Sequence, residues 1–495
     1  MVAAALAAFY LASRLWFVAG LPYFLDEGIF AGFSYAGRQS PHQLFVSLTI
    51  GKEPLQAWFG IGWQVLGVNP LMSMRLVSMI AGLLSLGSIG LLGRRVAGTA
   101  VGLVSAALCV VLPFFVVNDG VGIEEPLVTL VMSSALLVQI ELAEHPRLRW
   151  GSVLGLIWAA GIMTKQSCEA AVGLVPLSLL CLDWTATDRS RRLARWLGAV
   201  AIAAVAGVVS AEVVLRSSGY WATGQAFSRL FPLVRPLGQV LSHPFATTAN
   251  AWSVFRPAVT GYVTLPVAAL ASVGAVISWR RRPRMTALLA LWVILPFVVA
   301  LIFTLHPYPR HVMYALPPVI VFAAETLVGG VARARVASAG RWRIPASAVV
   351  VVLLLAPALL FDVRALAHPP IARYPGLDDL QYVTGVPAGG AWPGGVAAIR
   401  RRAVGTHVVV LAAEADPNVV RFLLSADPRA PGSRYRVVVP SQPLSARAQF
   451  ALVDQLPFSN PPALRFIAQH HFAVVGRFPR PRGGATVTLY ERPPR

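Results

Sequence analysis

Long apolar runs recur along this chain, and they constrain its fold more than any other feature. A helix that crosses a lipid bilayer needs about 20 mostly apolar residues. Runs that meet or approach this length occur at about 2–20, 74–93, 99–117, 126–143, 151–164, 169–183, 196–215, 258–279, 285–304, 312–332 and 344–361. Only 13% of the 495 residues are charged, whereas soluble domains carry about 25%. The sequence therefore predicts an α-helical polytopic membrane protein with about 11 transmembrane helices.

Arginine is concentrated in alternate connections between the expected spans, which predicts how the chain is oriented. Sixteen arginines lie in five of these connections, at 94–95, 145–150, 188–196, 279–284 and 333–343. Short cytoplasmic loops are enriched in Lys and Arg, so we expect these five connections in the cytoplasm. The protein is then expected in the plasma (inner) membrane. This topology accounts for the net charge of +21, so no nucleic-acid partner is expected.

The opposite, extracytoplasmic face then receives all the long segments. It is expected to carry 21–73, 118–125, 165–168, 216–257, 305–311 and the chain after 361. A connection as long as 21–73 is usually functional, and its beginning has the pattern of a short amphipathic helix lying on the membrane interface. The segment 216–257 mixes Arg, Pro and aromatic residues, and it is expected to lie on the interface in the same way.

The cysteines and the N-terminal run exclude some classes of protein. Cys109, Cys168 and Cys181 lie in or beside apolar runs, so neither a disulfide framework nor a Cys/His metal site is expected. The first apolar run lacks a basic start and is interrupted by Arg14, which favours an uncleaved span over a signal peptide. A charge inside a span usually faces the bundle interior, so Arg14 is expected to pair with a carboxylate or a lipid phosphate.

The composition changes after about Asp362, where Pro, Gly, Asp and Arg become frequent. The stretch "THVVVLAAEADPNVVRFLLSADPRAP" predicts a strand, a turn and a helix, and "YRVVVP", "HFAVVGRFP" and "ATVTLYERP" predict further strands. We therefore expect a transmembrane domain over 1–361 and a small extracytoplasmic α/β domain over 362–495.

Two acidic pairs are expected at the extracytoplasmic face. Asp26 and Glu27 follow the first span, and Glu124 and Glu125 precede the fourth. Acidic residues at a helix start are stabilised by the helix dipole, so a purely structural role explains both pairs. A carboxylate at this face can also accept a proton from a hydroxyl nucleophile, which suggests a catalytic role for Asp26 and Glu27. Glu124 and Glu125 could orient an acceptor, and oxygen ligands such as Glu125 could hold a divalent cation.

The chain has only two lysines, Lys52 and Lys165, and both are expected on the extracytoplasmic face. Lysines at an interface often extend toward the headgroups while their stems stay in apolar surroundings. Arginine does this equally well, however, and this chain otherwise uses arginine for its positive charges. A lysine ammonium is a compact charge that suits a phosphate. Lys52, Lys165, Arg310 and, at the head of the second span, Arg75 are therefore the candidate phosphate-binding residues.

Taken in order, these segments resemble the GT-C superfamily of polyprenyl-phosphate-sugar-dependent glycosyltransferases. The resemblance is greatest to the branch of protein O-mannosyltransferases and the lipid A aminoarabinose transferase. Its motifs are an Asp-Glu pair, Lys-Pro-Pro-Leu, acidic-Pro-Leu, Leu-Thr-Lys-Gly, and Arg-Tyr followed by Leu-Pro-Pro. The matching segments here are Asp26-Glu27, Lys52-Glu53-Pro54-Leu55, Glu125-Pro126-Leu127, Met163-Thr164-Lys165-Gln166, Arg310-His311 and Leu316-Pro317-Pro318. The chain departs from the pattern at Glu53 and His311, so these motifs do not identify the sugar.

The resemblance implies a function as well as a fold. A sugar carried by a polyprenyl phosphate would pass, with inversion, to a hydroxyl of an acceptor lipid, glycan or protein outside the membrane. Asp26 would be the general base, and Lys52, Lys165 and Arg310 would stabilise the leaving phosphate. Beyond the divalent cation considered at Glu125, no cofactor is implied.

Two other classes of protein would also account for parts of this sequence. A transporter or a flippase for lipid-linked sugars would explain the spans and the phosphate-binding charges. It explains less well the long segments gathered on one face and the lack of an internal repeat. A non-catalytic scaffold of the cell envelope would act through 362–495 alone.

Overall fold

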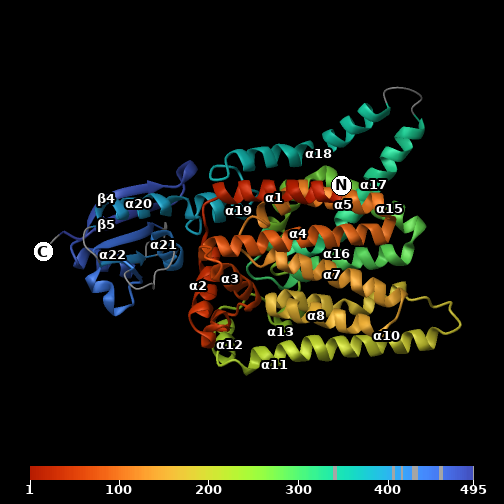
Figure 1. Ribbon diagram of the computed structural model, residues 1–495, viewed down its shortest axis with the longest axis horizontal. Coiled ribbons are helices and arrows are strands. Elements are labelled where there is room, and N and C mark those ends of the chain that lie inside the picture. The colour runs from red at the N-terminus through yellow and green to blue at the C-terminus, as the bar shows by residue number, and fades with distance from the viewer. Residues whose placement is uncertain (338–342, 404–406, 414–415, 426–432, 456–460, 494–495) are drawn as a thin grey trace.

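The computed structural model describes residues 1–495 except 338–342, 404–406, 414–415, 426–432, 456–460 and 494–495. Its main body is a bundle of helices that lie roughly along one common direction (Figure 1). Within the described residues, eight helical segments are long and apolar enough to cross a membrane. They are Val2–Gly20, Pro70–Ala97, Glu125–Glu144, Arg189–Ser217, Thr248–Arg281, Pro283–Phe303, Pro309–Arg333 and Ala348–Ala367.

The predicted polytopic helical fold is confirmed, but a count of 11 full-length spans is not. Three of the expected spans are occupied by shorter apolar helices, Thr99–Val111, Leu148–Thr164 and Gln166–Cys181. The last of these contains a 3₁₀ helix, Val175–Cys181, with Pro176 in its first turn. Proline cannot donate a backbone hydrogen bond, which limits how far a regular α-helix extends through this segment.

The end of helix α5 (Thr99–Val111) explains the buried arginine of the first span. Pro113 follows the helix and has no N–H for the carbonyl group of Cys109. Arg14 donates to that carbonyl at 3.2 Å and to the carbonyl of Val110 at 2.8 Å. Its hydrogen-bonding partners are therefore mainly backbone carbonyls at a helix C-terminus, where a positive charge is favourable. The carboxylate or lipid phosphate predicted for Arg14 is not its hydrogen-bonding partner in this structure.

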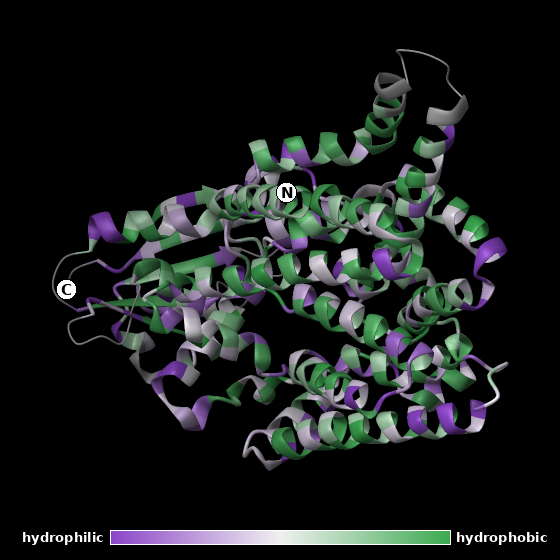
Figure 2. Ribbon diagram, turned by 45° about the vertical axis from the view of Figure 1, so that its right-hand side comes forward, coloured by the Kyte–Doolittle hydropathy of each residue, from purple (hydrophilic) through white to green (hydrophobic). Residues whose placement is uncertain are grey.

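The two ends of the bundle differ in what they carry (Figures 1 and 2). At one end lie the short helices α2 (Leu25–Gln39), α3 (Leu55–Val65), α12 (Trp221–Leu230) and α13 (Leu237–Ser242), and the C-terminal sheet lies beside α2. At the other end lie arginine-rich helix termini, such as the last turns of α4 (Pro70–Ala97) and α15 (Leu265–Arg281). Helices are thus present in both long segments in which interfacial helices were predicted.

The C-terminal region forms one mixed five-stranded sheet with the order β2-β1-β3-β5-β4. Its strands are β1 (Val408–Ala413), β2 (Tyr435–Val438), β3 (Phe450–Gln455), β4 (Ala473–Pro479) and β5 (Thr486–Glu491). β1 pairs in parallel with β2 and β3, and β5 pairs antiparallel with β3 and β4. Four strands match the prediction, whereas β3 was not predicted.

Helix α18 (Arg343–Ala367) continues past the expected boundary at residue 361.

The C-terminal sheet shares its hydrophobic core with the bundle. Phe30 and Tyr35 of α2 belong to the same buried cluster as Trp392 of α20 (Trp392–Arg402) and Val419 of α21 (Pro417–Leu424). The close approach of α21 to α2 requires a glycine, since a Cβ at Gly28 would lie 2.4 Å from the Val419 side chain. The C-terminal region therefore supports the helix that begins with Asp26 and Glu27.

Candidate active site

Charged residues from four distant segments meet where α2 approaches the bundle. The Nη2 atom of Arg310 lies 2.9 Å from Oδ2 of Asp26, and its Nε atom lies 3.2 Å from Oε1 of Glu125. The same Glu125 oxygen accepts a hydrogen bond from Nζ of Lys165 at 2.7 Å. Four residues predicted from separate motifs thus form a continuous chain of ion pairs, which we call the charged cluster.

The charged cluster extends through Glu124 to the other lysine. Oε2 of Glu124 lies 3.4 Å from Nζ of Lys165 and 3.9 Å from Nζ of Lys52. The Lys52 ammonium also lies 5.3 Å from the centre of the Phe30 ring, a distance at which a cation is attracted to the aromatic face. The only two lysines of the sequence therefore contact the same carboxylate.

The local sequence explains how each side chain reaches the charged cluster. Asp26 lies in the first turn of α2, and Glu125 begins α7 (Glu125–Glu144) with a proline directly after it, as helix starts favour. Lys165 follows the last residue of α8 (Leu148–Thr164) in an extended conformation, so its side chain leaves the helix axis. Lys52 follows Gly51, whose φ of +67° lies in the left-handed region that glycine tolerates.

The two lysines of the charged cluster are more exposed than the glutamates that they contact. The side chains of Glu124 and Glu125 are only 2% and 5% exposed, whereas those of Lys52 and Lys165 are 30% and 22% exposed. Burial lowers the pKa of Lys165, but the adjacent Glu125 and Glu124 carboxylates outweigh this and raise its pKa overall. The Lys165 ammonium is therefore charged at neutral pH. Both lysine side chains remain partly accessible, as an anion-binding surface requires.

Glu27 and Arg75 do not join the charged cluster, which differs from the roles expected for them. They form a buried pair with distances of 2.6 Å from Nε to Oε1 and 2.9 Å from Nη2 to Oε2. Arg75 also donates to the carbonyl groups of Val18, Leu21 and Pro22. All of its N–H groups are directed at these partners, so none is left for a phosphate. The pair instead ties the start of α2 to α4.

Comparisons with known proteins agree with this architecture. The segment 52–213 matches the family of dolichyl-phosphate-mannose-protein mannosyltransferases, and it contains Lys52, Glu124, Glu125 and Lys165. The apo crystal structure of ArnT from Cupriavidus metallidurans is similar to this chain with a TM-score of 0.60 and 17% identity, over 99% of this chain and 98% of ArnT. The chain therefore shares the overall fold of ArnT.

Further solved structures show the same fold. ArnT bound to undecaprenyl phosphate is similar with a TM-score of 0.61 and 17% identity, over 97% of both chains. The oligosaccharyltransferase AglB from Archaeoglobus fulgidus, in complex with an inhibitory peptide and a dolichol-phosphate, has a TM-score of 0.53 and 11% identity. That match covers 90% of this chain and 69% of AglB. No curated protein matches this sequence significantly.

The sequence did not predict the part of the candidate site that comes from the C-terminal region. Arg310 Nη1 donates to Oε1 of Gln381 at 2.6 Å, and the two residues are 71 positions apart. The next residue, Tyr382, is buried, and its ring packs edge-on against Phe24 at 5.2 Å. The segment 380–384 contains none of the motifs discussed above, so only the fold brings Gln381 to Arg310.

The predicted divalent cation remains a prediction. Within the described residues, no group of three or more His, Cys, Asp or Glu side chains could hold a metal ion. Glu125, the expected ligand, already accepts from Lys165 and pairs with Arg310. A cation would have to displace both positive groups, so these residues do not fit a metal site as they stand.

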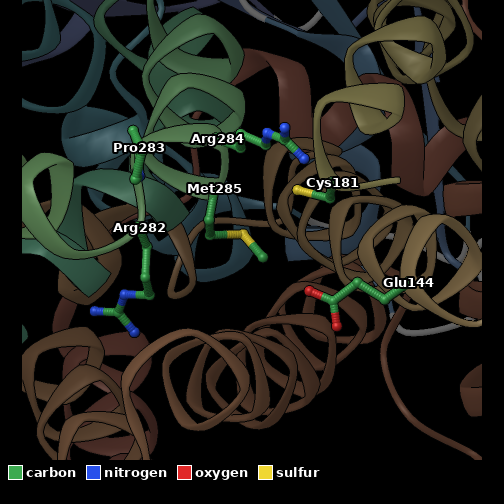
Figure 3. A pocket seen from close by; sticks show the side chains of 6 residues that line it. All are labelled: Glu144, Cys181, Arg282, Pro283, Arg284 and Met285. Atoms are coloured by element: carbon green, nitrogen blue, oxygen red, sulfur yellow. The ribbon is translucent and has the colours of Figure 1, made fainter. Parts of the chain in front are cut away.

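A pocket, shown in Figure 3, lies at the opposite end of α7 from Glu125, since Glu144 is the last residue of that helix. It has a volume of about 360 Å³ and is lined by Glu144, Cys181, Arg282, Pro283, Arg284 and Met285. Arg282, Pro283 and Arg284 belong to one of the arginine-rich connections. None of the predicted site residues lines this pocket, so it is separate from the candidate active site.

Proposed function

We propose that this protein is a membrane glycosyltransferase that moves a sugar from a polyprenyl-phosphate donor to a hydroxyl acceptor. The observation that carries the proposal is the chain of contacts from Asp26 through Arg310 and Glu125 to Lys165. It combines a carboxylate that can accept a proton with two cationic groups that suit a phosphate, and Lys52 joins them through Glu124. We propose that this face is extracytoplasmic, because the arginine-rich connections occupy the opposite end of the bundle.

The cations would bind the donor phosphate. Lys52 and Lys165 supply compact charges, and the planar guanidinium of Arg310 can bind a phosphate through two N–H groups. The related structures of ArnT and AglB contain undecaprenyl phosphate and dolichol-phosphate, respectively, which supports a lipid-linked donor here. The lipid tail would remain in the bilayer, so the enzyme would need to position only the sugar and the phosphate.

Transfer would occur by a single displacement with inversion at the anomeric carbon. The acceptor oxygen forms a bond to that carbon while the bond from the carbon to the phosphate oxygen breaks, and its electron pair stays on the phosphate. The proton of the acceptor hydroxyl passes to Asp26. Lys52, Lys165 and Arg310 stabilise the negative charge that grows on the leaving phosphate, a contribution of several kcal/mol by order of magnitude.

Binding of the donor would also prepare Asp26 as the base. In the structure Asp26 is paired with Arg310, so the guanidinium occupies one of its carboxylate oxygens. A phosphate that draws the guanidinium toward itself would release Asp26 for the acceptor hydroxyl. Glu125 would keep Arg310 and Lys165 near each other during this exchange.

Sugar transfer from labelled undecaprenyl-phosphate sugars tests the proposal. Purified protein in lipid nanodiscs should release undecaprenyl phosphate from the matching donor when an acceptor extract is present. Asp26→Asn should lower turnover at least about a hundredfold, since a positioned base contributes 10²–10⁴-fold in general. Asp183→Asn is the matched control, because Asp183 is exposed and contacts only Thr185 and its neighbours. Normal turnover by Asp26→Asn, or lipid translocation with no sugar release, would contradict the proposal.

A further inference from the structure

Glu53 is a carboxyl group beside the charged cluster that has no ion-pair partner. It follows Lys52 directly, and its side chain is half-buried. Its charged neighbours are Glu124 from the start of α7, Lys165 from the end of α8, and Lys52. The lysines pair with Glu124 and Glu125 instead. Its own backbone N–H donates to the Glu53 carboxyl, and within the described residues no cation forms an ion pair with it.

Charge balance in the cluster explains why Glu53 lacks a partner. Lys52, Lys165 and Arg310 are matched by three carboxylates, which belong to Asp26, Glu124 and Glu125. A fourth carboxylate would make the surface that should receive a phosphate negatively charged. A Glu53 that holds a proton leaves the cluster neutral, and a neutral carboxyl has one O–H donor to offer.

The surroundings of Glu53 favour the protonated form. Burial and the negative charge of Glu124 raise its pKa to about 8, and its own backbone N–H, Lys52 and Lys165 oppose this shift only in part. The Cys168 thiol also lies close enough to interact with Glu53. A buried carboxyl next to another carboxylate commonly behaves in this way.

We propose that Glu53 is a further donor-binding residue, which donates its O–H to the phosphate held by Lys52 and Lys165. This inference rests on the proposed function. In the donor, the phosphate is a diester with one negative charge. As the bond to the sugar breaks, the electron pair left on the phosphate adds a second negative charge. The hydrogen bond from Glu53 then strengthens, since bonds to charged acceptors are stronger, and the proton stays on the Glu53 carboxyl.

The proposed role of Glu53 also explains why this chain has glutamate where the Lys-Pro-Pro-Leu motif has its first proline. A proline at position 53 would offer neither a donor nor an acceptor in its side chain. Glutamate at this position adds a hydrogen-bond donor to the two lysines without adding charge. The surface around Lys52 is therefore suited to an anion that gains charge during the reaction.

Binding of undecaprenyl phosphate to the purified full-length protein between pH 7 and pH 9 tests this inference. Wild-type affinity should fall about tenfold as the pH rises through about 8, since Glu53 then loses its proton. Glu53→Gln keeps a neutral side chain with N–H donors, so its affinity should match the wild type at pH 7 and stay constant within threefold. Glu53→Ala should bind about tenfold more weakly at pH 7, as expected for the loss of a hydrogen bond to a charged group.

The controls separate this inference from the proposed function. Glu212→Gln changes a carboxyl that pairs with Arg216 on α11 (Ser210–Ser217), and it should show the wild-type pH profile. If Glu53→Gln shows the same loss of affinity with pH as the wild type, the role of Glu53 is refuted. Wild-type affinity in Glu53→Ala would refute it as well. If the wild-type protein does not bind undecaprenyl phosphate at any pH, the proposed function itself fails.

Discussion

Arg310 and Asp26 are paired at 2.9 Å although 284 residues separate them along the chain. The same guanidinium contacts Glu125 from the bundle and Gln381 from the C-terminal region. Arg310 is thus the residue through which α2, the bundle and the C-terminal region meet. A phosphate that binds Arg310 would compete with Asp26, so this pair couples donor binding to release of the proposed base.

Arg310→Gln tests the importance of that guanidinium. The substitution removes the positive charge next to the proposed leaving phosphate. We expect kcat/KM for the lipid-linked donor to fall about a hundredfold or more, as for other groups that stabilise transition-state charge. Arg310→Lys keeps the charge but cannot bond Asp26, Glu125 and Gln381 together, so its activity should be intermediate. Arg256→Gln serves as the control, since Arg256 is exposed on α14 (Thr248–Ala258). Wild-type kcat/KM in Arg310→Gln would contradict the role.

Gln381→Leu tests whether the C-terminal region positions Arg310. Gln381 accepts from Arg310 through its side-chain oxygen, so the loss of that oxygen leaves a buried guanidinium N–H without a partner. Such a loss costs about 1–3 kcal/mol, which we expect as a rise in KM for the donor of about tenfold or more. Gln381→Glu retains the accepting oxygen and should restore binding. If the leucine variant keeps the wild-type KM, Gln381 does not position Arg310.

Glu27→Gln separates a structural role from a catalytic one. The Glu27 and Arg75 side chains are 0% and 1% exposed, and breaking a buried pair costs about 3–5 kcal/mol. We therefore expect Glu27→Gln to lower the Tm markedly in a thermal-shift assay, with turnover per folded molecule close to the wild type. Arg75→Met should lower the Tm in the same way. A Glu27→Gln protein with the wild-type Tm and no activity would instead support the catalytic role suggested by the sequence.

Gly28→Leu tests the contact between α2 and α21. A Cβ atom at Gly28 would lie 2.4 Å from both Asp416 Oδ1 and Val419 Cγ2, so α2 and α21 would have to move apart. We expect a lower Tm and a loss of sugar transfer, because α2 carries Asp26. Gly62→Leu on α3 is the matched control, since no atom lies within 4 Å of its Cβ position. Equal stability of the two variants would show that this contact does not hold α2 in place.

The sequence by itself determined the class of the fold and the residue types of the site. The length of each apolar span and the enrichment of arginine in alternate connections are local properties of the sequence. Both can be recognised without knowing which helices pack together. The short motifs around Asp26, Lys52, Glu125, Lys165 and Arg310 also identified the members of the charged cluster. These motifs could be recognised because each consists of adjacent residues.

Only the tertiary structure decided which charges face one another. It paired Glu27 with Arg75 in the interior and Asp26 with Arg310 at the candidate site, although Asp26 and Glu27 are neighbours in sequence. It also added Gln381 and left Glu53 without an ion-pair partner among the described residues. Contacts of this kind join segments 48 to 284 residues apart. They depend on how the helices pack, and no local pattern in the sequence encodes that packing.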